Sequence, residues 1–118
     1  MIYKTFKDLH ISQLGMGNMR LPVNADSSID TEQAQRIIDC AFDHGVNYYD
    51  TAYVYHKGES ESFLGNALRN RPRDRYLLAT KFPGFLVHAG AEPERYFRGT
   101  APAVPHRLLR LLFNAQRE

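Results

Sequence analysis

Residues 47–61 read NYYDTAYVYHKGESE, and this stretch decides the fold. Its aromatic beginning has the composition of a strand, and its GESE end has the polar residues that open a helix. Residues 76–83, YLLATKFP, supply a second strand followed by a loop. Asp50 and Lys81 therefore fall at the carboxyl ends of two predicted strands, and Tyr55 lies shortly after the first of them.

Strands and helices alternate outward from these two stretches. Asp30 is the predicted N-cap of the first helix, because Gln33 follows three residues later and apolar residues then recur at helical spacing up to Gly45. The second predicted helix covers 59–69, and the predicted strands are 2–6, 11–14, 15–21, 46–49 and 76–80. Such alternation favours right-handed βαβ units and a parallel sheet.

A parallel sheet of this kind can be an open doubly wound sheet or a closed barrel. The barrel is favoured because Asp50 and Lys81 occupy carboxyl strand ends, where barrel active sites form, and because no Gly-x-Gly-x-x-Gly opens the first helix. A complete barrel takes about 250 residues, whereas this chain has 118. We therefore expect an α/β fold that is an incomplete (β/α)8 TIM barrel. It comprises an N-terminal hairpin and about the first three βα units within residues 1–87, followed by a nonmatching tail at 88–118.

The three residues at the strand ends suit proton transfer. A phenol has a free pKa near 10, so it releases a proton poorly at neutral pH unless a neighbouring cation stabilises the phenolate. Lys81 can be that cation, and Asp50 can hold its ammonium in place and keep it charged. Tyr55 is then the general acid for a carbonyl oxygen.

The spacing Asp-x-x-x-x-Tyr, followed by GESE and then by ATK, resembles the aldo-keto reductases over roughly residues 3–86. The resemblance implies that Asp50, Tyr55 and Lys81 are catalytic and surround the nicotinamide of NADPH, together with a later histidine that has no counterpart here. It implies reduction of a small-molecule carbonyl to an alcohol, and a hairpin that closes the bottom of the barrel.

The same resemblance brings Gly17, Asn18 and Met19, with Asp50, toward the cofactor. The N-terminal region also looks like reductases that carry a ferredoxin-like iron-sulfur tail, so an iron-sulfur cluster is expected only in an intact longer relative. Most of the NADPH site would likewise lie outside this chain. As a truncated form, the chain is expected to be inactive and prone to self-association through exposed strand edges.

Composition narrows the class of protein. With 43% hydrophobic residues, no membrane-spanning run and a net charge of +2, neither a membrane nor a nucleic-acid partner is expected. The N-terminus lacks a secretory pattern, which together with a single cysteine, Cys40, favours the cytoplasm. Cys40 is expected to be buried, no metal site is expected, and the arginines of 69–75 are interpreted as a solvated turn.

The tail after Val87 permits two interpretations. One is a basic amphipathic helix at 106–117, which would make the chain a noncatalytic interaction protein built on a partial barrel and an Arg/Leu-rich tail. The other is a frameshift, because codons permitted for residues 92–118, read one nucleotide forward, can encode NPNDIFEEQLRRCRTDYFDFYLTHNE. That product is similar to the next segment of the family, including its histidine. Sequencing the gene through these codons separates the two.

Overall fold

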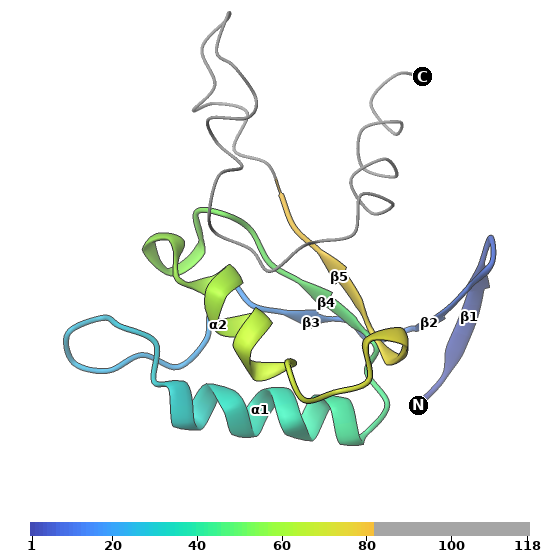
Figure 1. Ribbon diagram of the computed structural model, residues 1–118, viewed down its shortest axis with the longest axis horizontal. Coiled ribbons are helices and arrows are strands. Elements are labelled where there is room, and N and C mark those ends of the chain that lie inside the picture. Colours follow the sequence, from blue (N-terminus) through green and yellow to red (C-terminus); the bar gives the residue numbers. More distant parts are fainter. Residues whose placement is uncertain (82–118) are drawn as a thin grey trace, which may run out of the picture.

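The computed structural model describes residues 1–81, so the interpretations of the tail lie outside the described residues. The described part contains a two-stranded hairpin and a three-stranded sheet, with two helices against the sheet (Figure 1). The sheet consists of β3 (Met16–Gly17), β4 (Tyr48–Asp50) and β5 (Leu77–Ala79). The strands are parallel and lie in sequence order, which confirms the predicted βαβ arrangement.

Helix α1 (Thr31–Asp43) begins where the sequence predicts. The Asp30 side chain accepts a hydrogen bond from the backbone N–H of Gln33 at 3.0 Å, and the Gln33 side chain donates back to the same carboxylate at 3.2 Å. Gly45 follows the helix with a φ of +87°, a left-handed conformation that ends the helix. Helix α2 (Ser60–Ala67) is shorter than the predicted 59–69.

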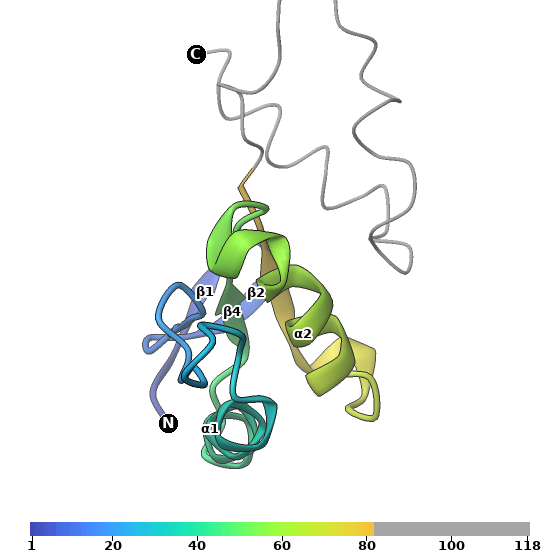
Figure 2. The same ribbon diagram turned by 90° about the vertical axis from the view of Figure 1, so that its left-hand side faces the viewer.

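Both helices cover one face of the sheet, as the nearly end-on view of α1 in Figure 2 shows. Tyr49 at the centre of β4 is fully buried between the sheet and the helices, where Ile38 of α1 and Leu64 of α2 belong to the same core. The Tyr49 hydroxyl donates to the carbonyl of Val46 at 3.1 Å. Side chains alternate along a strand, so Asp50 projects from the opposite face of the sheet.

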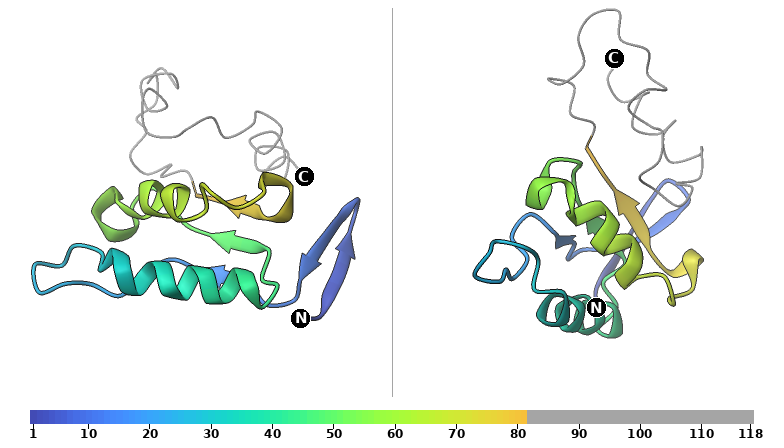
Figure 3. Two further views of the ribbon diagram at one scale, coloured as in Figure 1. Left: turned by 60° about the horizontal axis from the view of Figure 1, so that its bottom comes forward. Right: turned by 60° about the vertical axis from the view of Figure 1, so that its left-hand side comes forward.

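The hairpin pairs β1 (Tyr3–Phe6) with β2 (Leu9–Ser12) in antiparallel register. The backbone N–H of Ser12 donates to Asn47 Oδ1 at 2.8 Å, which fixes the hairpin beside the start of β4. In the left view of Figure 3, β4 and β5 point away from the hairpin. It therefore lies at the amino-terminal ends of the strands, as the predicted bottom of a barrel requires.

Two predicted strands were wrong in extent. The second strand is Leu9–Ser12 and not 11–14, because the chain reverses already at Lys7, whose φ is +54°. The third is Met16–Gly17 and not 15–21. Asn18 ends it by turning its own side chain onto the carbonyl of Asp50, at 2.8 Å.

Of the arginines interpreted as a solvated turn, Arg69, Arg73 and Arg75 are exposed, whereas Arg71 is half-buried against α1. Arg71 forms ion pairs with Asp39 at 2.9 Å and Asp43 at 3.2 Å, and its guanidinium lies 4.7 Å from the centroid of the Phe42 ring. The hydrogen bond from Arg71 lowers the pKa of the Asp39 carboxyl. This cluster ties α1 to the turn that follows α2. In contrast, the expectation that Cys40 is buried was wrong, since it lies on the exposed side of α1.

Candidate active site

Asp50 and Lys81 meet at the carboxyl ends of neighbouring strands. Asp50 is the last residue of β4 and pairs with Ala79 of β5 in the sheet register. Lys81 follows Ala79 by two residues and is therefore aimed to the same face of the sheet. The backbone N–H of Thr51 donates to the carbonyl of Ala79 at 2.8 Å, which extends the strand pairing to the level of the site.

The structure brings the three predicted catalytic residues together. The Lys81 ammonium donates to the carboxylate of Asp50 and, at 3.0 Å, to the carbonyl of Thr51. The same nitrogen lies 5.0 Å from the centroid of the Tyr55 ring. The side chain of Lys81 is 51% exposed and that of Asp50 is 35% exposed. An ion pair this open contributes little to folding, under about 1 kcal/mol.

The environment keeps Lys81 charged. Partial burial by itself lowers the pKa of the Lys81 ammonium, but the hydrogen bond to Asp50 and then the contact with Tyr55 act in the opposite direction. The net effect is a pKa above the ordinary value of 10.5. The ammonium is therefore fully protonated at neutral pH, and a positive charge stands beside the phenol.

A network of buried polar groups holds the ends of β3 and β4 in place through hydrogen bonds. Asn18 is fully buried, and both its backbone N–H and its side-chain amide donate to the carbonyl of Asp50, at 2.9 and 2.8 Å. The hydroxyl of Ser60 donates to the carbonyl of Asn18 at 3.2 Å and lies 2.8 Å from the hydroxyl of Thr51. The network joins the loop after β3, the end of β4 and the first residue of α2.

The residues predicted to face a cofactor take different positions. Gly17 pairs with Asp50 in the sheet register, and a Cβ added to it would meet no atom within 4 Å. Met19 is 59% exposed. Asn18, in contrast, is enclosed by its neighbours, although its Oδ1 has no hydrogen-bond partner among the described residues. Gly17 thus leaves open space beside Asp50, whereas Asn18 holds the backbone around that space.

Sequence reasoning missed one residue here. His56 is half-buried, and its Nε2 accepts a hydrogen bond from the backbone N–H of Leu21 at 3.1 Å. Its backbone is left-handed, with φ 50° and ψ 45°. Histidine is enriched several-fold among non-glycine residues with positive φ, so the run Tyr-His-Lys-Gly did contain a signal for such a turn.

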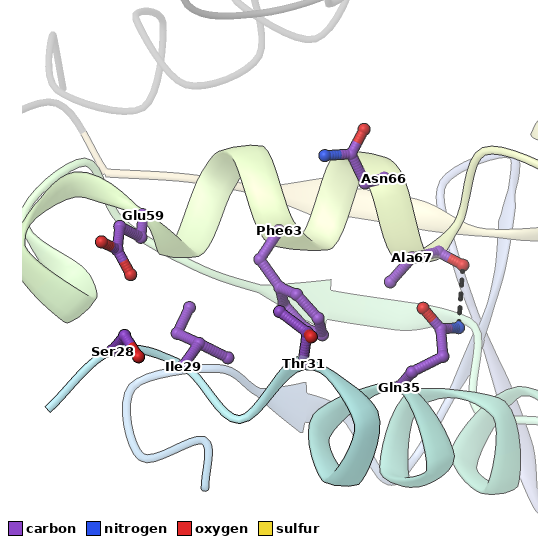
Figure 4. A pocket seen from close by; sticks show the side chains of 8 residues that line it. All are labelled: Ser28, Ile29, Thr31, Gln35, Glu59, Phe63, Asn66 and Ala67. Carbon is purple, nitrogen blue, oxygen red and sulfur yellow. Dashed lines mark hydrogen bonds between the residues drawn. The ribbon is translucent and has the colours of Figure 1, made fainter. Parts of the chain in front are cut away.

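A cavity of about 440 Å³ lies between the two helices, away from the three predicted catalytic residues. Ile29, Phe63 and Ala67 contribute to its lining, and the Gln35 side chain spans its end to donate to the carbonyl of Ala67 at 3.2 Å (Figure 4). Asp50, Tyr55 and Lys81 do not line it, so it is not the candidate reaction site.

Within residues 1–81, no cluster of three or more histidine, cysteine or acidic side chains is arranged to hold a metal ion, and the absence of a metal from the whole protein stays a prediction. In the same residues, no helix combines the length and the apolar character that crossing a membrane requires.

Parallel βα units with polar side chains gathered at the carboxyl ends of their strands are typical of TIM-barrel enzymes, whose active sites lie at that end. The sequence model of the aldo/keto reductase family matches residues 13–104. The chain belongs to the aldo/keto reductase family. The match extends beyond residue 87, the predicted end of the barrel part, and that boundary stays a prediction.

Individual relatives agree with this assignment. The chain is 40% identical over 74 residues to the uncharacterized oxidoreductase YqkF of Bacillus subtilis, a match that covers 63% of this chain and 22% of the relative. The holo form of aldo-keto reductase AKR11C1 from Bacillus halodurans is similar with a TM-score of 0.55 and 44% identity, over 64% of this chain and 23% of that one.

An aldo-keto reductase from Klebsiella pneumoniae, solved in complex with NADPH, is similar with a TM-score of 0.56 and 28% identity. That match covers 70% of this chain and 28% of the Klebsiella chain. The chain thus spans between a fifth and a third of the lengths of these relatives. Their TIM-barrel architecture confirms the predicted fold class, with the described residues as one part of the barrel.

Proposed function

We propose that this chain carries the first part of an NADP(H)-dependent oxidoreductase that reduces a small-molecule carbonyl to an alcohol. The observation that supports this most directly is the Lys81 ammonium, which contacts the Asp50 carboxylate and lies 5.0 Å from the Tyr55 ring centroid. Family membership and the NADPH complex of the Klebsiella relative support the choice of cofactor.

The residues present fit a nicotinamide at this end of the sheet. Gly17 leaves open space beside Asp50, since a Cβ added to it would meet no atom within 4 Å. Gly17, Met19 and Asp50 would border the ring, and Asn18 would hold their backbone in place. When bound, NADPH supplies the hydride.

Tyr55, Lys81 and Asp50 would together transfer the proton to the substrate. Tyr55 donates its hydroxyl proton to the carbonyl oxygen as negative charge develops on that oxygen. Lys81 stabilises the resulting phenolate by its positive charge. Asp50 holds the Lys81 ammonium in place through a charge-assisted hydrogen bond and keeps its pKa high. The remaining strands of a barrel of about 250 residues would complete the walls around the substrate.

A chimera tests this proposal. Residues 1–81 replace the matching start of AKR11C1 from Bacillus halodurans, which completes the barrel with a 44% identical relative. We expect NADPH-dependent reduction of simple aldehydes or ketones, measured as consumption of the reduced cofactor. Tyr55→Phe should lower kcat by about 100-fold or more, because it removes the general acid.

Tyr53→Phe is the matched control, since Tyr53 lies two residues away in the same loop and is 42% exposed. It should keep the activity. A folded chimera that binds NADPH and in which Tyr55→Phe retains the unsubstituted rate would overturn the assignment of Tyr55. In parallel, the 118-residue chain alone is expected to show no turnover, and turnover by the chain alone would contradict its predicted inactivity.

A further inference from the structure

We propose that His56 is a positioning residue for Tyr55, an inference that rests on the function proposed above. His56 follows Tyr55 directly in the chain, and its Nε2 accepts a hydrogen bond from the backbone N–H of Leu21 at 3.1 Å. An imidazole that accepts through Nε2 carries its proton on Nδ1. The contact therefore fixes both the tautomer and the direction of the ring next to the candidate general acid.

The backbone around His56 needs such an anchor. His56 and Lys57 have φ values of 50° and 56°, and Gly58 follows with a φ of +94°. Three successive left-handed residues reverse the chain at once after Tyr55, and L-residues avoid this conformation unless the surroundings impose it. Backbone bonds of the turn include one from the N–H of Tyr55 to the carbonyl of Ala52 and one from the N–H of Glu59 to that of His56, both 3.1 Å.

The other end of the anchor is rigid. Leu21 is 5% exposed and belongs to the hydrophobic core, so its N–H is a fixed donor. Leu21 also continues the loop after β3 that contains Asn18, which is bonded to the end of β4. Through His56, the loop that carries Tyr55 is thus attached to the neighbouring βα loop as well as to its own strand.

The hydrogen bond to Leu21 distinguishes His56 from the neighbouring Lys57. Both residues are left-handed, but Lys57 is exposed and makes no side-chain hydrogen bond within residues 1–81. Glycine at either position relieves the same backbone strain. Only His56→Gly also removes the bond to Leu21, so the two glycine variants isolate the effect of the imidazole.

The experiment is nuclear magnetic resonance on the 118-residue chain and needs neither NADPH nor turnover, so its failure is distinguishable from failure of the proposed function. Two quantities are measured: amide hydrogen exchange at Leu21, and the ring-current shift that the Tyr55 ring imposes on the Lys81 side chain. Tyr55→Leu provides the Lys81 shift without the ring. In His56→Gly, Leu21 exchange should rise about tenfold, the factor that a net hydrogen bond contributes, and the ring-current shift should disappear.

Lys57→Gly should leave both quantities unchanged. His56→Gln, whose side-chain oxygen has a reach similar to that of Nε2, should restore both, and it keeps the test decisive if His56→Gly fails to fold. The proposal is overturned if Leu21 exchanges faster in His56→Gly while the Lys81 shift persists, because His56 would then only fasten the loop. It is also overturned if Leu21 exchange does not change, or if His56→Gln loses the Lys81 shift.

Discussion

At the scale of single residues, the proximity of Asp50 and Lys81 was predictable from the sequence, whereas the contacts of the residues around them were not. Asp50 and Lys81 could be assigned to one site because the carboxyl ends of neighbouring parallel strands must lie together. The structure confirms their contact. The hydrogen bond of His56 could not be predicted, because its donor is the backbone of Leu21, 35 positions away. No local pattern gives a contact of that kind.

Asp50→Asn should weaken catalysis in the AKR11C1 chimera through Lys81. The carboxylate raises the pKa of Lys81 above 10.5, and a raised pKa keeps the ammonium charged until the pH rises through it. Without the carboxylate, the alkaline limb of the kcat/KM profile should move to lower pH, and kcat at neutral pH should fall about tenfold or more. An alkaline limb at the same pH in Asp50→Asn and the unsubstituted chimera would exclude this role for Asp50.

The buried phenol of Tyr49 should make the free energy of unfolding depend on pH in the alkaline range. Burial raises the pKa of Tyr49 to about 12, from 10.0. The stability that the neutral Tyr49 phenol contributes is fully present below a pH near 10, the pKa of tyrosine in the unfolded chain. This stability is lost as the pH rises through 12, and a difference of two pKa units corresponds to about 3 kcal/mol of unfolding free energy. Urea unfolding at pH 7 and near pH 11 should show a larger loss for the natural chain than for Tyr49→Phe. Equal losses in the two proteins would contradict the buried, neutral phenol.

At the scale of elements, prediction succeeded where a local side-chain signal exists. Asp30 and Gln33 indicated the start of α1 correctly, because an N-cap acts within one turn of its helix. No local side-chain signal of this kind marks the end of β3. Asn18 ends that strand through a bond to Asp50, a residue 32 positions away, whereas the apolar residues that follow continue the appearance of a strand.

Asp30→Ala should destabilise the chain by about 1 kcal/mol, the usual contribution of an N-cap. The alanine leaves the backbone N–H of Gln33 without its 3.0 Å acceptor. Asp74→Ala removes an equal charge from an exposed residue that has no side-chain hydrogen bond within the described part of the chain, so it is the control. Chemical denaturation measures both variants, and an equal loss of unfolding free energy in the two would mean that charge and not capping is responsible.

At the scale of the whole molecule, the sheet has two unlike faces. The helices cover the face of Tyr49, and the other face presents Tyr48, Leu77 and Ala79, all only half-buried. Within residues 1–81, β3 and β5 each pair with a single strand, β4. In a closed barrel this second face is the interior. The alternation of strands and helices was sufficient to predict this architecture, and the motif residues were sufficient to choose a barrel.

We expect the chain to self-associate through this second face, because it combines apolar side chains with unpaired strand edges. Sedimentation velocity should show a mass that rises with protein concentration. Leu77→Glu should reduce the association by placing a charge on the open face. Ile37→Glu places the same charge on an exposed position of α1, 40% exposed, and should not change it. A sedimentation mass that stays that of the monomer at every protein concentration would contradict this prediction.

The sequence order of the sheet bears on how the protein is made. Because β3, β4 and β5 are neighbours in the order in which they are synthesised, every group of the Asp50, Tyr55 and Lys81 site has left the ribosome once residue 81 has emerged. The pairings within the sheet join strands that follow one another along the chain, from Met16 with Tyr49 to Asp50 with Ala79, so none of them waits for a later part of the chain. In a full-length relative, the charges of the site can therefore pair while most of the barrel is still untranslated. The nascent chain would hold the carboxylate, the ammonium and the phenol of the candidate site together long before the walls around that site exist.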